Sequence, residues 1–244
     1  MKRFYLGTHE QSWLKRLKGI PLFMSRRRLA RLKNLYPSVT RWACDSGGFT
    51  ELNLHGEWKT SESQYVEELH RYHEEVGRLD WAAPQDWMCE PFVLEKTGLT
   101  IEEHQRRTTA SVISLRDRLP PRIHVIPVLQ GFHLEDYLTH LDQYEREGFH
   151  LAQEKVVGVG SVCRRQGTDD AADIFRSLQA RGLKLHGFGL KKQAIRKYGH
   201  LLHSADSMAW SYAGRRKPDP NCPKKSCSNC LHYALAWRDN VLSL

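Results

Sequence analysis

Short strand-like segments alternate with helical patterns along the whole chain, and no other feature of the sequence restricts its fold as strongly. Aromatic and β-branched residues dominate the strand-like segments. These segments lie at residues 3–6, 20–24, 41–44, 80–84, 123–129, 155–160, 184–189 and 204–210. Helical patterns lie between and after them, at residues 10–18, 26–36, 61–79, 101–119, 134–147, 169–181, 191–202 and 228–241. The alternation predicts a parallel α/β sheet, and the strand count favours a closed (β/α)8 barrel of the TIM type over an open doubly wound sheet.

Length and composition fit one soluble barrel domain. The chain has 244 residues, 40% of them hydrophobic and 27% charged, and no linker or repeat divides it. We expect one domain over 1–244 with a short cysteine-bearing tail. A membrane span is excluded because no long apolar run exists, and the N-terminus lacks the apolar stretch of a signal peptide. We therefore expect a cytoplasmic protein whose six cysteines are metal ligands or free thiols.

The formal net charge of +9 indicates a polyanionic partner, and nucleic acid is the first candidate. Clustered basic residues follow apolar segments, where loops are expected to begin. These clusters are Arg26–Arg28, Arg164 and Arg165, Lys191 and Lys192, Arg215–Lys217, and Lys224 and Lys225. Solvated helix faces are the alternative explanation, and we prefer it for Arg31 and Lys33.

Polar side chains mark the ends of several predicted strands. Asp45, Asp86 and Asp206 follow three of them, and Gln130 follows a fourth. The carboxyl ends of the strands carry the chemistry in barrels of this type, so one mouth would collect all four side chains. A carboxylate at a strand end can instead cap the next helix. Against this alternative, Asp45 precedes Gly47-Gly48, where the backbone can approach a ligand closely.

Paired carboxylates in one pocket permit displacement at the anomeric carbon of a sugar. One attacks C1′ and forms a covalent glycosyl-enzyme, while the other handles the proton of the departing or arriving group. A third carboxylate could accept hydrogen bonds from the N1–H and 2-amino group of a guanine-like base. Gln130 could donate to O6, and the glycine-rich segment 157–161 could offer a backbone N–H. Phe49 and Trp87 lie beside candidate carboxylates and could stack on a base.

Cys222, Cys227 and Cys230 form a good three-ligand set for Zn²⁺ in a reducing compartment. Because they follow the last predicted strand, we expect a structural metal site in segment 222–232. His232 is the nearest candidate for the fourth ligand, and His200 or His203 could serve through space. Cys44, Cys89 and Cys163 lie next to predicted strands and are better explained as buried thiols.

An ordered series of motifs resembles the tRNA-guanine transglycosylase superfamily over about residues 3–232. Each motif is short, and their common order makes the series specific. The matching segments are Asp45-Ser46-Gly47-Gly48-Phe49, Val128-Leu129-Gln130-Gly131, Val157-Gly158-Val159-Gly160-Ser161-Val162, His186-Gly187-Phe188-Gly189, Ser204-Ala205-Asp206-Ser207, and the three tail cysteines.

This resemblance implies a TIM barrel that exchanges guanine in a nucleic acid for a 7-deazaguanine base. Position by position, it implies that Asp206 is the nucleophile and Asp45 the general acid/base. The implied substrate-binding residues are Ser46, Gly47, Asp86, Gln130, Gly131 and Gly160. The implied cofactor is one structural Zn²⁺.

Three departures from the superfamily pattern narrow the expected substrate. Thr50 replaces the glutamine usual after the Asp-Ser-Gly-Gly-Phe motif, and the cysteine spacing is C-x4-C-x2-C. The chain also stops soon after Cys230, without room for the superfamily's distant histidine or an RNA-binding domain. These features are more similar to the DNA-modifying branch, so DNA is expected as the polymer, with tRNA as the close alternative.

Two other functional classes remain open at this point. A hydrolytic N-glycosylase would use water in place of the incoming base. A non-catalytic zinc protein could bind nucleic acid on a barrel that has lost its activity. The second is disfavoured because both candidate catalytic aspartates are present. A partner protein could supply recognition that this short chain lacks.

Overall fold

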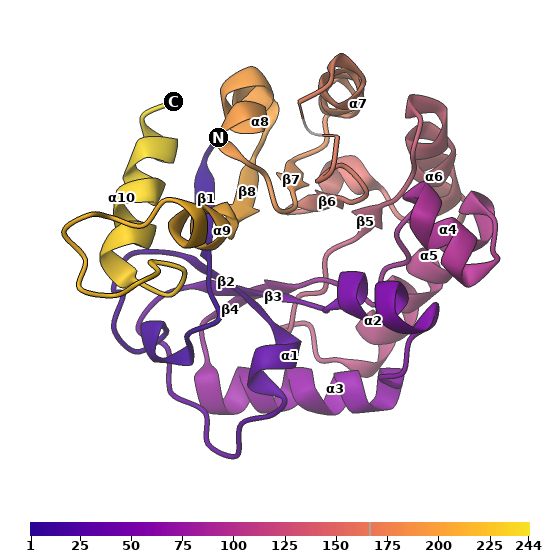
Figure 1. Ribbon diagram of the computed structural model, residues 1–244. Helices are drawn as coiled ribbons and strands as arrows, with labels where there is room; N and C mark the ends of the chain where they lie inside the picture. The colour runs from indigo at the N-terminus through magenta and orange to yellow at the C-terminus, as the bar shows by residue number, and fades with distance from the viewer. Residues whose placement is uncertain (166) are drawn as a thin grey trace.

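The protein is described by a computed structural model covering residues 1–165 and 167–244, in which parallel strands curl into a near barrel (Figure 1). The described residues contain an 8-stranded sheet in the order β4-β3-β2-β1-β8-β7-β6-β5. The strands are β1 (Arg3–Gly7), β2 (Leu22–Ser25), β3 (Trp42–Asp45), β4 (Leu79–Ala82), β5 (Val128–Leu129), β6 (Val157–Val159), β7 (Leu185–Gly187) and β8 (Ser204–Ser207). The predicted α/β barrel class is confirmed.

The ring of strands closes through one short contact between β4 and the segment that precedes β5. Ala82 N–H donates to the His124 carbonyl at 2.9 Å, and Ile126 N–H donates to the Ala82 carbonyl at 3.1 Å. Pro127 follows directly and has no N–H to donate to β4, and the chain then pairs with β6 on its other side, through Val128 and Leu129. The predicted strand 123–129 is therefore split into a bridge and a two-residue strand.

Helices surround the strands, as expected for a βα alternation (Figure 1). They are α1 (Arg26–Leu29), α2 (Gly48–His55), α3 (Glu62–Arg71), α4 (Pro91–Thr97), α5 (Ile101–Arg118), α6 (Leu134–Arg146), α7 (Asp169–Ala180), α8 (Lys192–Tyr198), α9 (Ala209–Arg216) and α10 (Leu231–Leu242). Hydroxyls cap three of the long ones, since Ser61, Thr100 and Thr168 each accept from a backbone N–H of the first turn. None of the described helices has the length and apolar character needed to cross a bilayer.

Alternate strand residues face either the helices or the inside of the barrel. Leu22 and Met24 of β2 pack in the large core beneath the helices. Their neighbour Phe23 instead joins a second cluster with Tyr5, Ala43, Trp81 and Val128. This second cluster fills the barrel interior. A residue two positions after an inward-facing one, as Asp45 is after Ala43, must then face inward at the carboxyl end.

A buried ion-pair network fixes the helices that follow β2 and β3. The Arg26 guanidinium contacts Glu68 of α3 twice, at 2.5 and 2.8 Å, and donates to Thr60 Oγ1 at 2.7 Å. Glu51 of α2 lies 3.5 Å away and accepts from Thr60. The expectation that Arg26 faces nucleic acid with Arg27 and Arg28 is therefore wrong, because its charge is buried and paired.

Candidate active site and metal centre

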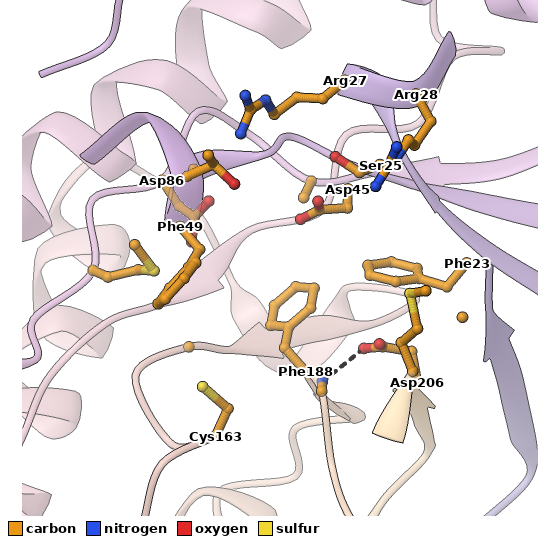
Figure 2. A pocket seen from close by; sticks show the side chains of 18 of the residues that line it. Phe23, Ser25, Arg27, Arg28, Asp45, Phe49, Asp86, Cys163, Phe188 and Asp206 are labelled. Atoms are coloured by element: carbon orange, nitrogen blue, oxygen red, sulfur yellow. Dashed lines mark hydrogen bonds between the residues drawn. The ribbon is translucent and has the colours of Figure 1, made fainter. Parts of the chain in front are cut away.

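A cavity of about 480 Å³ opens at the carboxyl ends of the strands, where the barrel mouth was expected (Figure 2). Three carboxylates from separate parts of the chain, Asp45, Asp86 and Asp206, line this cavity. They are separated by 41 and 120 residues in sequence, and the curled sheet brings them together. Gly160 lines the same cavity, whereas Ser46, Gly47, Gln130 and Gly131 lie behind its wall.

Asp206 lies at the end of β8 and is held by two donors. Gly189 N–H donates to Asp206 Oδ1 at 2.9 Å, and His186 Nε2 lies 3.2 Å from the same oxygen. His186 is fully buried, and its Nδ1 lies 2.9 Å from Ser204 Oγ. If His186 carries its proton on Nε2, it donates to the Asp206 carboxylate and its Nδ1 accepts from the Ser204 hydroxyl. These hydrogen bonds fix the orientation of the Asp206 side chain.

Asp45 lies at the end of β3, beside Ser25 of β2 in the strand register. Burial raises the pKa of Asp45, the Ser25 hydroxyl lowers it, and the neighbouring Asp206 charge raises it. The net shift is upward, so Asp45 holds a proton more readily than an exposed aspartate. Asp45 and Asp206 therefore differ in their surroundings, although both face the same cavity.

Asp86 follows β4 in the loop that leads to α4. Ser46 Oγ donates to its Oδ1 at 3.1 Å, and Gln130 Nε2 donates to its Oδ2 at 2.6 Å. Burial, followed by the charge of Asp45, raises the pKa of Asp86 to about 7. The carboxyl thus changes its protonation state near neutral pH, and two fixed donors orient it.

Gln130 and Gly160 make contacts within the protein that differ from the base-binding contacts expected for them. Gln130 is fully buried, and its amide oxygen accepts from Ser161 Oγ at 2.7 Å while its nitrogen supports Asp86. Gly160 N–H donates to the Leu129 carbonyl at 3.0 Å within the sheet, so it is not free for a base. A Cβ at Gly160 would stand 2.3 Å from the Gln130 amide. Glycine is therefore required there because the Gln130 side chain crosses its Cα.

Gly47 and Gly131 are also needed for the shape of the backbone. Gly47 has φ 82°, a left-handed conformation, and caps α2. A Cβ at Gly131 would come within 2.7 Å of Asp136 and 3.0 Å of Tyr137. Both residues thus support the cavity from behind, without lining it.

Aromatic and sulfur-containing side chains form the other walls of the cavity. Phe23, Phe49 and Phe188 surround it together with Met88 and Met208 (Figure 2). Phe49 is 41% exposed, which leaves a ring face available to a ligand. Trp87, also expected to stack on a base, does not line the cavity; it packs on His104, under the Arg107 guanidinium.

Basic side chains stand at the rim. Arg27, Arg28 and Arg31 line the cavity, and Arg28 Nε lies 3.1 Å from His9 Nδ1. Arg31 was expected on a solvated helix face, but α1 ends at Leu29 and this side chain turns toward the mouth. Lys192 lies elsewhere, because its Nζ donates to Asn240 of α10 at 2.8 Å.

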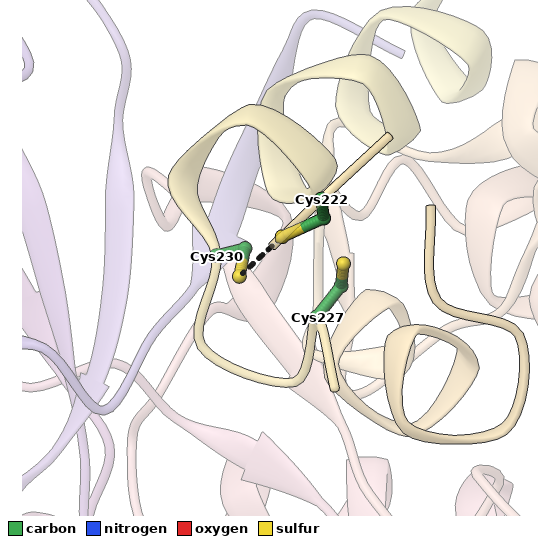
Figure 3. Close-up of side chains that lie close together, drawn as sticks. All are labelled: Cys222, Cys227 and Cys230. Carbon is green, nitrogen blue, oxygen red and sulfur yellow. Dashed lines mark hydrogen bonds between the residues drawn. The ribbon is translucent and has the colours of Figure 1, made fainter. Parts of the chain in front are cut away.

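The three cysteines of the tail form a compact cluster between α9 and α10 (Figure 3). The sulfurs of Cys222, Cys227 and Cys230 lie within 4.8 Å of one another, and those of Cys222 and Cys230 are 3.8 Å apart. Two thiolates bound tetrahedrally to one Zn²⁺ at about 2.3 Å are about 3.8 Å apart. The cluster could therefore hold a metal ion, and its soft donors suit zinc. His232 is not brought into it; its Nε2 lies 3.5 Å from Asp219 Oδ2.

Sequence reasoning missed several side chains that shape the cavity, among them Phe188, Met208 and Glu90. Phe188 lies between two glycines, a spacing that could have marked it as projecting from the strand end. Met208 follows β8 at the expected mouth. Glu90 lies eight residues beyond β4, and nothing in its sequence neighbourhood distinguishes it from a surface glutamate.

The fold and the cavity define a parallel α/β barrel protein with an acidic, aromatic-walled site at the carboxyl ends of its strands. The family model described as "DpdA: DeoxyPurine in DNA protein A" matches residues 1–243. The chain therefore belongs to the DpdA family, the DNA deazapurine modification branch of the tRNA-guanine transglycosylase superfamily. No curated protein matched the chain.

Proposed function

We propose that this protein is a DNA guanine transglycosylase, which replaces guanine in DNA with a 7-deazaguanine base. One observation carries the proposal: Asp45, Asp86 and Asp206 line a single cavity in a chain of the DpdA family. The cavity volume of about 480 Å³ is in the range of small-molecule sites and accommodates one nucleoside. We take 1–244 as one transglycosylase domain.

In the first half of the reaction, an Asp206 oxygen attacks C1′ of the target deoxyguanosine. The C1′–N9 bond breaks, its electron pair moves to the base, and the Asp45 carboxyl supplies the proton that the departing guanine needs. The contacts with Gly189 and His186 orient the Asp206 carboxylate for attack. The raised pKa of Asp45 keeps a proton available for donation.

In the second half, the Asp45 carboxylate accepts the N9 proton of the incoming 7-deazaguanine. The N9 electron pair then attacks C1′, and the bond between C1′ and Asp206 breaks. Both aspartates return to their starting states, so the exchange needs no other reactant. The first displacement inverts the anomeric carbon in the covalent intermediate, and the second restores the original configuration in the product.

Asp86 is the residue that recognises the base. Its ionised carboxylate accepts from the N1–H and 2-amino group, both of which are donors in guanine and 7-deazaguanine. Gln130 and Ser46 position this carboxylate. Gln130 would need to turn from its bond to Asp86 to reach O6. Phe49, with its exposed ring face, is the candidate for stacking on the base, a contact worth roughly 1–3 kcal/mol.

The tail is proposed to hold one structural Zn²⁺ through Cys222, Cys227 and Cys230. Cys227 packs against α9, where a Cβ on Gly214 would stand 2.7 Å from its carbonyl oxygen. Cys230 caps α10, and Trp237 of that helix contacts Phe4 of β1. A metal in segment 222–232 would therefore fasten α9 to α10 over the seam of β1 and β8. His232 is a candidate fourth ligand if it turns away from Asp219.

Covalent trapping tests the mechanism. The wild type, incubated with guanine-containing DNA, is expected to give a protein–DNA adduct that survives denaturation. Asp206→Asn should give none, because an amide oxygen is a poor nucleophile. Asp45→Asn should retain correct folding and slow turnover by about 10²-fold or more. An undiminished adduct in Asp206→Asn would remove that residue from the role of nucleophile.

A further inference from the structure

Glu90 is a buried carboxyl group that the proposed mechanism leaves unused. It lies at the N-terminus of α4, lines the cavity and is only 4% exposed. Neither of its carboxyl oxygens has a hydrogen-bond partner of good geometry among the described residues, although the Ser161 hydroxyl and the charges of Arg164 and Arg165 lie close enough to act on it. A buried polar group without a partner is destabilising, and more so if it is charged. Such a group at a cavity wall is best explained by a bond that forms when a ligand binds.

A chain of hydrogen bonds connects the Asp86 end of the cavity to Glu90. Gln130 links Asp86 to Ser161, and Ser161 Oγ accepts from Cys89 N–H, next to Glu90, at 2.7 Å. The one hydroxyl proton of Ser161 is donated to Gln130, so it is not available to Glu90. Ser161 has φ 55°, a left-handed backbone that is uncommon outside glycine. Strain of this kind concentrates at functional sites.

The order of atoms along a guanine-type base matches the order of these residues. Passing around the base from the 2-amino group, one meets N1, then O6 and then position 7. If N1 and the 2-amino group bind Asp86, O6 faces Gln130, and position 7 faces the other end of the hydrogen-bonded series of residues. Glu90 lies at that end, next to Cys89. This step rests on the function proposed above, because it assumes a base bound through Asp86.

We propose that the Glu90 carboxyl hydrogen-bonds to a polar substituent on C7 of the incoming 7-deazaguanine and so selects it. Guanine offers only the ring nitrogen N7 at this position, which lacks the reach of a C7 substituent and has no proton to donate to the Glu90 carboxylate. The exchange would therefore favour release of guanine and retention of the substituted base. An amine-type substituent donates to the carboxylate, whereas a nitrile accepts from the protonated acid. Burial raises the pKa of Glu90, which makes the protonated form accessible.

Binding of free bases by titration calorimetry tests this proposal. The ligands are guanine, 7-deazaguanine, 7-cyano-7-deazaguanine and 7-aminomethyl-7-deazaguanine. The wild type is expected to bind one of the two substituted bases roughly tenfold or more tightly than 7-deazaguanine. Glu90→Leu should reduce this preference to less than about threefold and leave the Kd of guanine and 7-deazaguanine nearly unchanged. Glu95→Gln, an exposed position on the same helix, is the matched control and should keep the full preference.

The isosteric variant Glu90→Gln separates the two forms of recognition. It keeps a donor and an acceptor, so a preference for the nitrile should survive, whereas a preference for the amine should be lost with the charge. A full preference in Glu90→Leu would overturn the proposal while the transglycosylase function stands. Failure of the wild type to bind any of the four bases would overturn the proposed function itself, together with this inference.

Discussion

At the scale of single residues, three aspartates of the same chemical type have different environments in one cavity. Asp206 accepts from two fixed donors, and Asp45 is buried beside a second carboxylate. Asp86 titrates near neutral pH. Surroundings that push the pKa values of neighbouring acids apart are how one site carries both an acid and a nucleophile.

The pH dependence of base binding follows from Asp86. Its pKa of about 7 lies above its ordinary value, so Asp86 is protonated below pH 7 and ionised above it. Because the base offers donors, affinity for 7-deazaguanine should fall about tenfold per pH unit below pH 7. Calorimetry between pH 5.5 and 8.5 measures this. Asp86→Asn should bind weakly with no such dependence.

Asp45→Asn serves as the control for that titration. Asparagine cannot carry the charge with which Asp45 raises the pKa of Asp86, so the midpoint should stay or move to lower pH while the dependence persists. A profile that is flat in the wild type, or a midpoint that rises in Asp45→Asn, would contradict the assignment of Asp86.

The sequence was sufficient to find the carboxylates, because each follows an apolar strand and strand ends share one edge. The sequence was not sufficient to show that Arg26 is buried, because its partners Glu51 and Glu68 are 25 and 42 positions away along the chain. Nor could it show that Gln130 turns back onto Asp86. Side-chain pairing between distant segments depends on the folded geometry and leaves no local pattern.

At the scale of elements, strand and long-helix positions were predicted well, and the short helices only in part. Helices α1 and α8 fall within predicted helical segments, whereas α2, α4 and α9, with 7 or 8 residues each, were missed. The predicted strand 204–210 ends at Ser207, and the residues after Met208 form α9. There Trp210 donates to the Gly7 carbonyl at 2.8 Å, which holds the new helix across the end of β1.

The buried network around Arg26 should be a major source of stability for α1, α2 and α3. Arg26→Met leaves Glu68 buried without its partner and should lower the free energy of unfolding by about 3–5 kcal/mol. Arg28→Met, two positions on and exposed, should change it by less than about 0.5 kcal/mol. Urea denaturation provides the comparison, and equal effects of both changes would refute the structural role of Arg26.

The cysteine cluster predicts about one zinc per chain by metal analysis. Cys227→Ser should lose the metal and lower the melting temperature, because the link between α9 and α10 is broken. Cys163→Ser, which lies outside the cluster, should keep the metal. The account of the tail fails if Cys227→Ser retains full zinc.

At the scale of the whole molecule, basic side chains lie around the cavity at one end of the barrel. Arg27, Arg28 and Arg31 flank the mouth, and Arg164 stacks on Phe92 with 4.2 Å between its guanidinium carbon and the ring centre. A duplex guanine must leave the base stack to reach the aspartates. Cations around the opening would hold the flanking phosphates while the base enters.

Salt dependence locates the phosphate contacts. Replacing Arg27 and Arg28 by alanine should reduce the slope of log affinity against log salt by up to about two, because two ion contacts are lost. The matched control replaces Arg146, the last residue of α6, and Arg181, which follows α7, both at the opposite end of the barrel. An equal reduction of the salt slope in both double variants would show that DNA does not bind preferentially at the barrel mouth.

The central claim is base exchange in DNA, and mass spectrometry of nucleosides tests it most directly. DNA and total tRNA are incubated separately with the protein and a 7-deazaguanine, then digested and analysed. The account predicts 7-deazaguanine deoxyribonucleosides from DNA with stoichiometric guanine release, and neither product with Asp206→Asn. Modified ribonucleosides alone would show that the polymer is tRNA, and guanine release without incorporation would show a hydrolytic glycosylase; either result would contradict the claim.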